Sequence, residues 1–356
     1  KKTIDVMSGD EFRSFVDRIF QGASNHDEAV AALGTANTDW QEEIYRTAVS
    51  HDHNVTVTGA AKNLPYRASV GYTDEQGILK TSDFKRVTAA LNLNPSLFDD
   101  HLVINLNAKG MYAHSRFADT GAVGAAVSMD PTQAVNAFTS EYAAEKLNSP
   151  ELMGTTLRNF GGYYEWLGTG AALGDKNFAW MPFKDATKNP LALLETKNDV
   201  ANSRQFIGSA DFDYKVHGFE DLRLHLTLGA DISKGRQNTT YDPSSPVFGR
   251  FYYGTSGYTQ KTKRNLTLSA YAQYFKDFDD DHHFDIMAGY EWQNFWRSEK
   301  TDLPRYIPMT NDDEAARGTQ TDYLNASDNS VFKTENYLVS FFGRANYTLL
   351  NRYMLT

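Results

Sequence analysis

Apolar and polar residues alternate along most of this chain, and this alternation limits what the chain can fold into. In the segment EDLRLHLTLGADIS, every second residue from Leu222 to Ile232 is apolar. The residues between them are Arg223, His225, Thr227, Gly229 and Asp231. Successive side chains of a β-strand point to opposite sides of the sheet. The period of two therefore predicts a strand with one apolar face.

The same period recurs along the sequence and predicts a large antiparallel sheet. Neighbouring strands are expected to pair in chain order. We count nine such strands and the beginning of a tenth at Tyr353–Thr356; the nine span 53–59, 65–73, 83–95, 101–114, 203–216, 222–234, 262–276, 283–298 and 334–349.

One segment between two of these strands, YFKDFDDDHHFDIMAGYEW, carries the ligand types of a metal site. Its acidic and histidine side chains suit zinc or manganese. However, alternating segments flank it on both sides, and aspartate tolerates turn geometry. Two adjacent histidines at the start of a strand would also point to opposite faces. We therefore interpret the stretch as a solvated turn without a structural metal: Asp279, Asp280, Asp281, His282 and His283.

The connections between the predicted strands fall into two classes of length that alternate along the chain. Short turns are expected at 60–64, 97–100, 217–221, 276–282 and 350–352, and longer links at 73–81, 115–202, 234–262 and 298–333. All short turns then lie at one end of the sheet and all longer links at the other. This segregation is typical of outer-membrane barrels, which have short periplasmic turns and long extracellular loops.

The composition agrees with a membrane barrel and excludes several other classes. No stretch approaches the roughly 18 apolar residues of a membrane helix, but the strands of a barrel are only half apolar. The net charge of -10 argues against a nucleic-acid partner, and the absence of cysteine excludes disulfides. We predict an all-β, antiparallel, up-and-down transmembrane β-barrel segment of about ten strands. The alternative is a soluble β-domain whose apolar face packs on a second sheet.

Short helices are expected in the N-terminal region and in the longer links. Ser8 with Glu11, and Thr38 with Gln41, have the spacing of capping boxes, and residues 25–33 form an Ala-rich helix before Gly34. An Ala-rich helical stretch is also expected near Pro131–Leu147. Since the N-terminal helices precede the first strand, they should lie on the long-link side. We assign residues 1–52 to an extracellular loop with short helices, and 53–356 to a partial barrel with a long extracellular loop at 115–202.

The region from TDWQEEIYR to NLNAKG, residues 38–110, resembles the SusC/RagA family of TonB-dependent outer-membrane transporters. Further segments resemble the same family, so that the resemblance covers essentially the whole chain: GAVGAAVSMDPTQAV, NPLALLE and SFFGRANYTLLNRYMLT. In that family a barrel of about 22 strands surrounds an N-terminal plug. The resemblance implies that this chain is an internal barrel fragment without the plug and the C-terminal strands.

What the resemblance implies about function is the active import of oligosaccharides or peptides across the outer membrane of a Gram-negative bacterium of the Bacteroidota. The implied partners are a SusD-like surface lipoprotein that covers the barrel, TonB acting through the missing plug, the substrate, and membrane lipid.

Two other classes of function are weighed against import. A passive porin or adhesin would lack the plug, and a soluble β-domain could bind glycans. Enzyme motifs are absent from the sequence, which lacks GxSxG, HExxH and a phosphate loop. We therefore expect no catalytic residue, no cofactor and no bound metal.

The longest link, 115–202, is the expected place for ligand contact. It contains NFGGYYEWLGTG and NFAWMPF, whose aromatic faces could stack on sugar rings, with Asn159, Glu165 and Asp175 as hydrogen-bonding groups. Links of this length without structure are uncommon unless functional or disordered. An equally simple interpretation is that the aromatic residues form the loop's own core. The candidates for substrate or lid contact are Tyr163, Tyr164, Trp166, Trp180 and Phe183.

Overall fold

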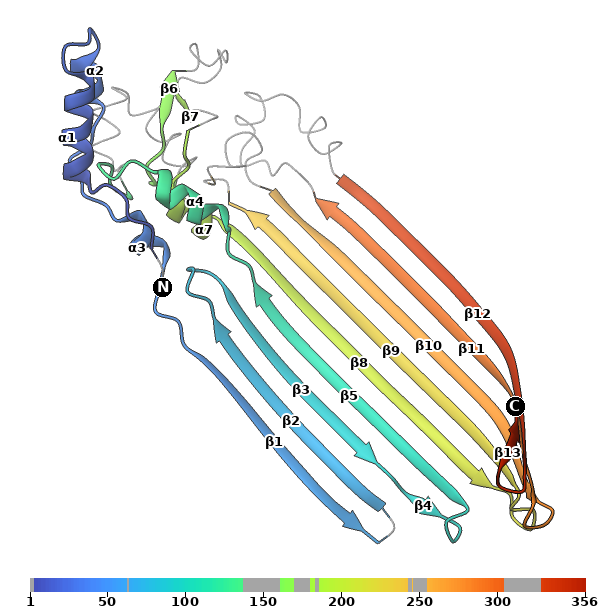
Figure 1. The fold of residues 1–356 in the computed structure, drawn as a ribbon. Coiled ribbons are helices and arrows are strands. Elements are labelled where there is room, and N and C mark those ends of the chain that lie inside the picture. Colours follow the sequence, from blue (N-terminus) through green and yellow to red (C-terminus); the bar gives the residue numbers. More distant parts are fainter. Residues whose placement is uncertain are drawn as a thin grey trace.

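Eleven strands form one antiparallel sheet in the computed structural model (Figure 1), which describes residues 3–62, 64–136, 161–169, 180–182, 186–242, 245, 255–303 and 328–356. The strands pair in the order β1-β2-β3-β5-β8-β9-β10-β11-β12-β13, and β4 pairs with β5. Their bounds are β1 Ser50–Ala61, β2 Leu64–Gln76, β3 Asp83–Leu93, β4 Ser96–Leu97, β5 Leu102–Arg116, β8 Lys197–Lys215, β9 Leu222–Tyr241, β10 Thr255–Asp277, β11 His282–Leu303, β12 Asp328–Leu349 and β13 Tyr353–Leu355.

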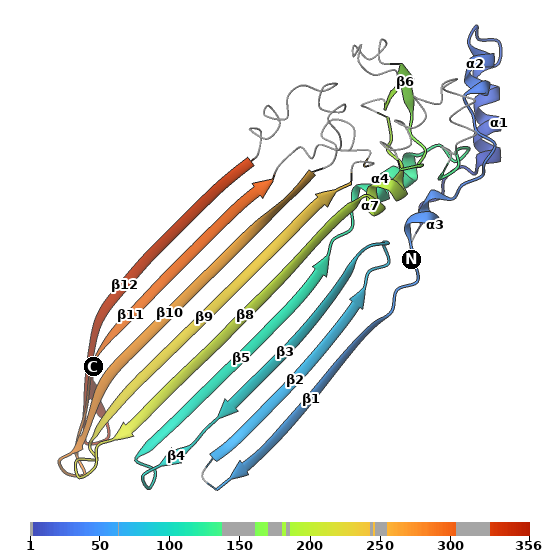
Figure 2. The ribbon, with the colours of Figure 1, turned by 180° about the vertical axis from the view of Figure 1, so that it is seen from behind.

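The predicted all-β antiparallel fold is confirmed, because every predicted strand is present and neighbours pair in chain order. Within the described residues the sheet is not closed, and β1 and β13 are its edges (Figures 1 and 2). Several strands extend further toward the long links than the alternation predicted. β10 starts at Thr255 rather than 262, and β11 ends at Leu303 rather than 298. In these added segments the backbones still pair, although the side chains on the apolar face of the sheet are no longer apolar.

The short turns and the long links lie at opposite ends of the sheet, as predicted (Figure 1). The acidic segment joins β10 to β11, and the Asp279 carboxylate accepts a hydrogen bond from the Asp281 amide at 2.9 Å. His282 lies 2.5 Å from the Tyr347 hydroxyl, and His283 lies 2.6 Å from an Asp277 carboxylate oxygen. The interpretation of this segment as a turn is therefore confirmed. Among the described residues, no group of three or more His, Asp or Glu side chains is placed to hold a metal ion.

The two faces of the sheet differ in chemistry. On one face large apolar side chains are exposed: Phe341 by 82%, Val55 by 67% and Tyr337 by 63%. On the other face polar side chains bond across the strands, as where Lys263 and Gln205 both donate to the Asp231 carboxylate at 3.3 and 3.0 Å. The sheet thus has one apolar and one polar surface, although no second sheet of the described chain covers the apolar one.

The helices gather on the long-link side, as predicted for the N-terminal ones (Figure 1). They are α1 Gly9–Phe20, α2 His26–Ala31, α3 Trp40–Ile44, α4 Gly121–Ser128 and α7 Pro190–Glu195, with a hairpin of β6 Leu167–Thr169 and β7 Trp180–Pro182. In the described part of the chain, no helix is both long enough and apolar enough to cross a membrane.

Two helix predictions need correction. The capping box of α1 is present, but α3 is capped by Asp39, whose carboxylate accepts from the Gln41 and Glu42 amides at 3.0 Å. The Thr38 hydroxyl instead donates to the Gln133 carbonyl at 2.7 Å. Residues 131–136 form turns rather than the expected helix, and α4 lies before them; the rest of that predicted stretch is outside the described residues.

Candidate functional site

The helices on the long-link side form a small folded unit, which we call the loop cap and define as residues 3–49, 117–136, 161–166 and 186–196. It joins the N-terminal region to the link between β5 and β8, which spans 117–196 rather than the expected 115–202. Figure 1 shows α4 and α7 next to the ends of β5 and β8, and α3 next to the ends of β1 to β3. The loop cap therefore lies at the long-link end of the sheet.

A compact apolar core holds the loop cap together. Ile44 and Leu194 are fully buried, Trp40 is 2% exposed, and these side chains come from segments more than a hundred residues apart. The remaining buried members are Ala122, Ala126, Met129 and Tyr164. Burial of large apolar side chains contributes roughly 1.5–3 kcal/mol each, so these contacts explain why α3, α4 and α7 pack together although none exceeds eight residues.

A polar turn at residues 130–133 fixes the N-terminal region to this core. The Asp130 carboxylate accepts from the Thr132 amide and hydroxyl at 2.7 Å, while the Trp40 indole donates to the Asp130 carbonyl at 2.9 Å. The Gly34 amide in turn donates to the Thr132 hydroxyl at 3.0 Å. A side chain at position 34 would come within 2.1 Å of the Thr132 carbonyl oxygen, so the close approach of these segments requires glycine.

A second polar junction connects the aromatic segment to α7. The Asn189 carboxamide oxygen caps α7 by accepting from the Leu191 and Ala192 amides at 3.0 and 3.1 Å. Glu165 is only 3% exposed and accepts from the Asn189 amide at 3.3 Å. Burial raises the pKa of Glu165 to about 7, opposed in part by that hydrogen bond and by the charge of Lys188. Glu165 is thus a buried acid that titrates near neutral pH.

The sequence-predicted aromatic residues occupy different environments in the loop cap. Tyr164 is 6% exposed, and its ring meets the Trp166 ring edge-on at 5.4 Å. The Tyr163 hydroxyl donates to Glu195, and burial raises the pKa of Tyr163. Trp180 belongs to β7, but its side chain is outside the description. Phe183 is also outside the described residues, as are the hydrogen-bonding candidates Asn159 and Asp175.

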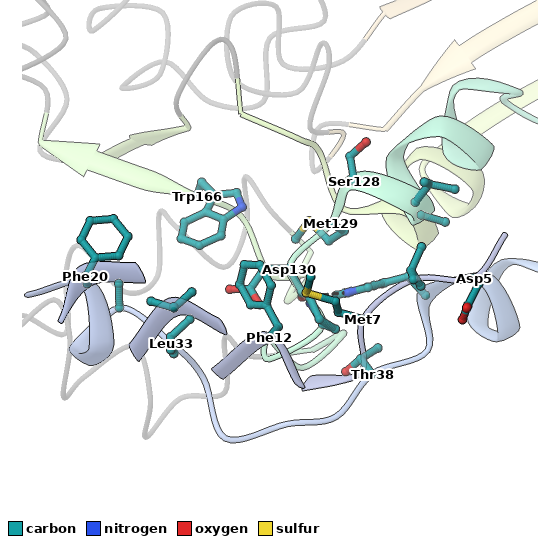
Figure 3. A pocket seen from close by; sticks show the side chains of 18 residues that line it. Asp5, Met7, Phe12, Phe20, Leu33, Thr38, Ser128, Met129, Asp130 and Trp166 are labelled. Atoms are coloured by element: carbon teal, nitrogen blue, oxygen red, sulfur yellow. Dashed lines mark hydrogen bonds between the residues drawn. The ribbon is translucent and has the colours of Figure 1, made fainter. Parts of the chain in front are cut away.

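An open groove of about 670 Å³ lies between α1 and α4, with Trp166 on its wall. Figure 3 shows Phe12, Phe20 and Leu33 on one side of it, and Met129 and Trp166 on the other. Asp5 and Asp130 also line it. The groove is thus mostly apolar with a few polar groups, a surface suited to another protein's side chain or to the apolar face of a solute.

Sequence reasoning missed most of this groove. Phe12 with Val16, and Trp40 with Ile44, have the spacing of a helix face in the sequence. This spacing carries no information on which distant segments those faces contact. The turn at 130–133 left a weak signal in the pattern Asp-Pro-Thr, which is typical of a turn.

Comparison with known proteins places the whole chain among outer-membrane receptors. No protein-family model matches it. It is 42% identical over 357 residues to the TonB-dependent receptor SusC of Bacteroides thetaiotaomicron, covering 100% of this chain and 32% of SusC. TonB-dependent receptor P3 of Formosa agariphila is 25% identical and is covered to 31%. The chain thus spans about a third of the length of these relatives.

Solved structures give the same picture for the fold. The RagAB peptide transporter superimposes with a TM-score of 0.60 at 17% identity, over 97% of this chain and 38% of that one. The 'closed-closed' state of the RagAB peptide importer superimposes with a TM-score of 0.58. At this identity the likeness concerns the fold alone.

Proposed function

We propose that this chain, which belongs to the TonB-dependent receptors of the SusC type, forms part of the wall and outer mouth of an outer-membrane importer. The resemblance to this family noted in the sequence is confirmed by the 42% identity to SusC over the whole chain. The observation that carries the proposal is the two-sided sheet. Its exposed apolar face suits lipid, its hydrogen-bonded polar face suits a wet lumen, and its long links gather at one end.

In this arrangement residues 1–52 and the link between β5 and β8 lie outside the cell, and the short turns lie in the periplasm. The polar face lines the lumen, where Asp231 and Asp285 each accept from several donors on neighbouring strands. Energy would come from TonB acting on a plug. The transported solute is an oligosaccharide or a peptide.

The loop cap is the proposed contact surface for a SusD-like lipoprotein or for the substrate. Support comes from the open apolar groove and from its position at the mouth. The proposed contacts remain Tyr163, Tyr164, Trp166, Trp180 and Phe183; of these, Trp166 lines the groove, whereas Tyr164 supports it from the core.

Cysteine labelling tests the orientation, because these 356 residues contribute no cysteine of their own and any cysteine elsewhere in the receptor can be replaced by serine first. In the full-length receptor, Ser24→Cys lies between α1 and α2, and Asp280→Cys lies in the turn between β10 and β11. Both positions are exposed in the structure. A membrane-impermeant maleimide added to intact cells should label position 24 and should leave position 280 unlabelled until the outer membrane is opened. The reverse pattern, or equal labelling, would refute the proposal.

Import itself is tested with radiolabelled oligosaccharide and peptide mixtures in cells that express the full-length receptor. Accumulation should stop when TonB is removed, because active import requires the motor. Uptake that continues without TonB would indicate a passive pore. The cargo class follows from which mixture accumulates.

A further inference from the structure

Six exposed cations lie on the apolar side of the sheet, just beyond its apolar band toward the long links. We call them the basic rim: Arg204, Lys234, Arg236, Arg264, Lys300 and Lys333. The strand register places them on this face. Arg204 pairs with Lys234, and the residues two positions nearer the turns, Phe206 and Ile232, pair in the same way on the apolar face.

The basic rim begins where the apolar band ends. Arg264 pairs with both Ile232 and Trp296, and its guanidinium lies 5.7 Å from the Trp296 ring centre. Lys234 lies one row further out and Arg236 two rows further. Because two residues advance a strand by about 6.7 Å, the rim spans about 13 Å along the strands. An aromatic ring at the edge of an apolar band, followed by cations, is the order expected at a membrane interface.

Few anions of the described chain balance these charges. Over β8 to β12, the described acidic side chains on the same face are Glu335 and Asp302. The single ion pair formed within the described rim joins Arg264 to Glu335 at 3.9 Å. Several other rim cations rest on aromatic rings instead, as where Arg236 lies 3.9 Å from the Tyr258 ring centre. This excess of positive charge occurs in a chain whose net charge is -10.

We propose that the basic rim binds the phosphate groups of anionic lipids in the outer leaflet of the membrane. The inference rests on the proposed function, since it requires the apolar face to lie in lipid. Arginine can bind phosphate with two parallel hydrogen bonds, and lysine acts as a point charge. The neighbouring apolar side chains, Phe206 at 46% and Ile232 at 41% exposure, are placed to contact the acyl chains below the headgroup. A lipid can contact both the basic rim and the apolar side chains beside it, whereas a soluble anion can contact only the basic rim.

The test measures the binding of phosphatidylglycerol to the full-length receptor in nonionic detergent, with phosphatidylcholine as the uncharged comparison. The outer variant combines Lys234→Gln, Arg236→Gln and Lys333→Gln. The matched control removes three cations from the opposite face of the same sheet: Lys109→Gln, Lys261→Gln and Lys263→Gln. Each cation near a lipid surface contributes about fivefold to binding, so the outer variant should bind phosphatidylglycerol about 100-fold more weakly. The control should bind it as the parent does.

Three results would overturn the proposal: unchanged binding in the outer variant, an equal loss in the control, or displacement of the lipid by inorganic phosphate at the same concentration. If the outer variant does not fold, the single variants Lys234→Gln and Lys333→Gln are measured instead, each with an expected loss of about fivefold. Lys234→Arg with Lys333→Arg keeps the charge and should keep the binding. The readout needs neither TonB nor substrate. Failure here with correct cysteine labelling would therefore leave the proposed function standing.

Discussion

Phe341 in the sheet is 82% exposed, whereas Leu194 in the loop cap, also apolar, is fully buried. This difference in exposure holds for the two regions as a whole. The large apolar side chains of the sheet point outward from one face, and those of the loop cap point into a shared core. The sheet is held by its backbone pairing, and its apolar surface is left for another medium. The cap is held by side-chain packing, as expected of a unit folded in water.

The comparison agrees with the proposed function, in which the sheet lies in lipid and the loop cap lies in water. In lipid, apolar side chains need no partner within the protein, but every backbone polar group does, and the strands between the two edges of the sheet satisfy theirs by pairing. In water, unpaired backbone groups can bond to solvent, whereas apolar side chains need a core. A unit as small as the loop cap therefore depends on each buried side chain. Loss of a large apolar side chain should therefore cost much more stability in the loop cap than on the apolar face of the sheet.

The largest expected effect is the loss of the loop-cap core. Trp40 is 2% exposed and donates its indole hydrogen bond to the Asp130 carbonyl. Trp40→Ala should destabilise the cap by about 3–5 kcal/mol, because it leaves a cavity and removes one of the two hydrogen bonds that the Asp130 carbonyl accepts. Hydrogen exchange of the full-length receptor should show faster exchange in α3, α4 and α7 and unchanged exchange in β8 to β12. A loss of protection in the sheet as well would show that the two regions are not separable.

The corresponding substitution in the sheet also removes a large aromatic side chain. Phe341→Ala exposes no cavity in a core, so thermal unfolding of the receptor in detergent should change much less than with Trp40→Ala. A loss comparable to that of Trp40→Ala would show that Phe341 packs against protein rather than lipid.

A charge placed on the apolar face should come next in size. Leu228 lies within the apolar band of β9 and is 39% exposed, and Thr227 lies beside it on the opposite face. Leu228→Arg should cost about 2–4 kcal/mol in membranes, whereas Thr227→Arg faces water and should cost little. Urea unfolding of the full-length receptor in lipid vesicles measures both. An equal loss of unfolding free energy for the two variants would show that both faces of the sheet lie in the same environment.

The sheet could be predicted from the sequence because its signal is local. Each strand repeats its apolar period within about ten residues, and the turn at Asp279–Asp281 follows from the strands on both sides. The strand ends were missed because pairing outlasts the period: the added residues near Thr255 and Leu303 are polar or mixed.

The loop cap could be predicted only in part, because its structure depends on distant contacts. The helix faces that contain Trp40 and Ile44 are visible in the sequence, but their contact with Leu194 is not. The predicted N-cap residue of α3 was wrong by one position, because Thr38 and Asp39 are both good N-cap residues. Asp39 caps the helix, while Thr38 bonds to the turn at Gln133.

The pH dependence of the loop cap is the next prediction. Burial raises the pKa of Glu165 from 4.5 to about 7, so the folded cap binds a proton more tightly than the unfolded chain does. Stability is therefore greatest below pH 4.5, falls as the pH rises toward 7, and then levels off. The total change is about 3 kcal/mol, since each pKa unit corresponds to about 1.4 kcal/mol. Hydrogen exchange in α7 at several pH values measures it.

Glu165→Gln should remove this pH dependence, because glutamine keeps the shape and cannot ionise. Sheet exchange should show no matching change over the same range once the intrinsic exchange rate is corrected. If the variant retains the parent's pH profile in α7, another group is responsible.

The smallest expected effect concerns the two histidines of the turn between β10 and β11. His282 contacts the Tyr347 hydroxyl, and His283 contacts the exposed Asp277 carboxylate. The His283–Asp277 pair is exposed and contributes roughly 0–1 kcal/mol, and the strands on either side are held by their own backbone ladder. The double variant His282→Ala with His283→Ala should therefore unfold within about 1 kcal/mol of the parent and should import substrate at the parent's rate. Metal analysis of the purified receptor decides between a turn and a metal site, because loss of one bound zinc or manganese ion per chain in the variant would identify a site. A large loss of stability without any metal would instead mean that side-chain contacts of this turn stabilise the sheet, as side-chain packing stabilises the loop cap.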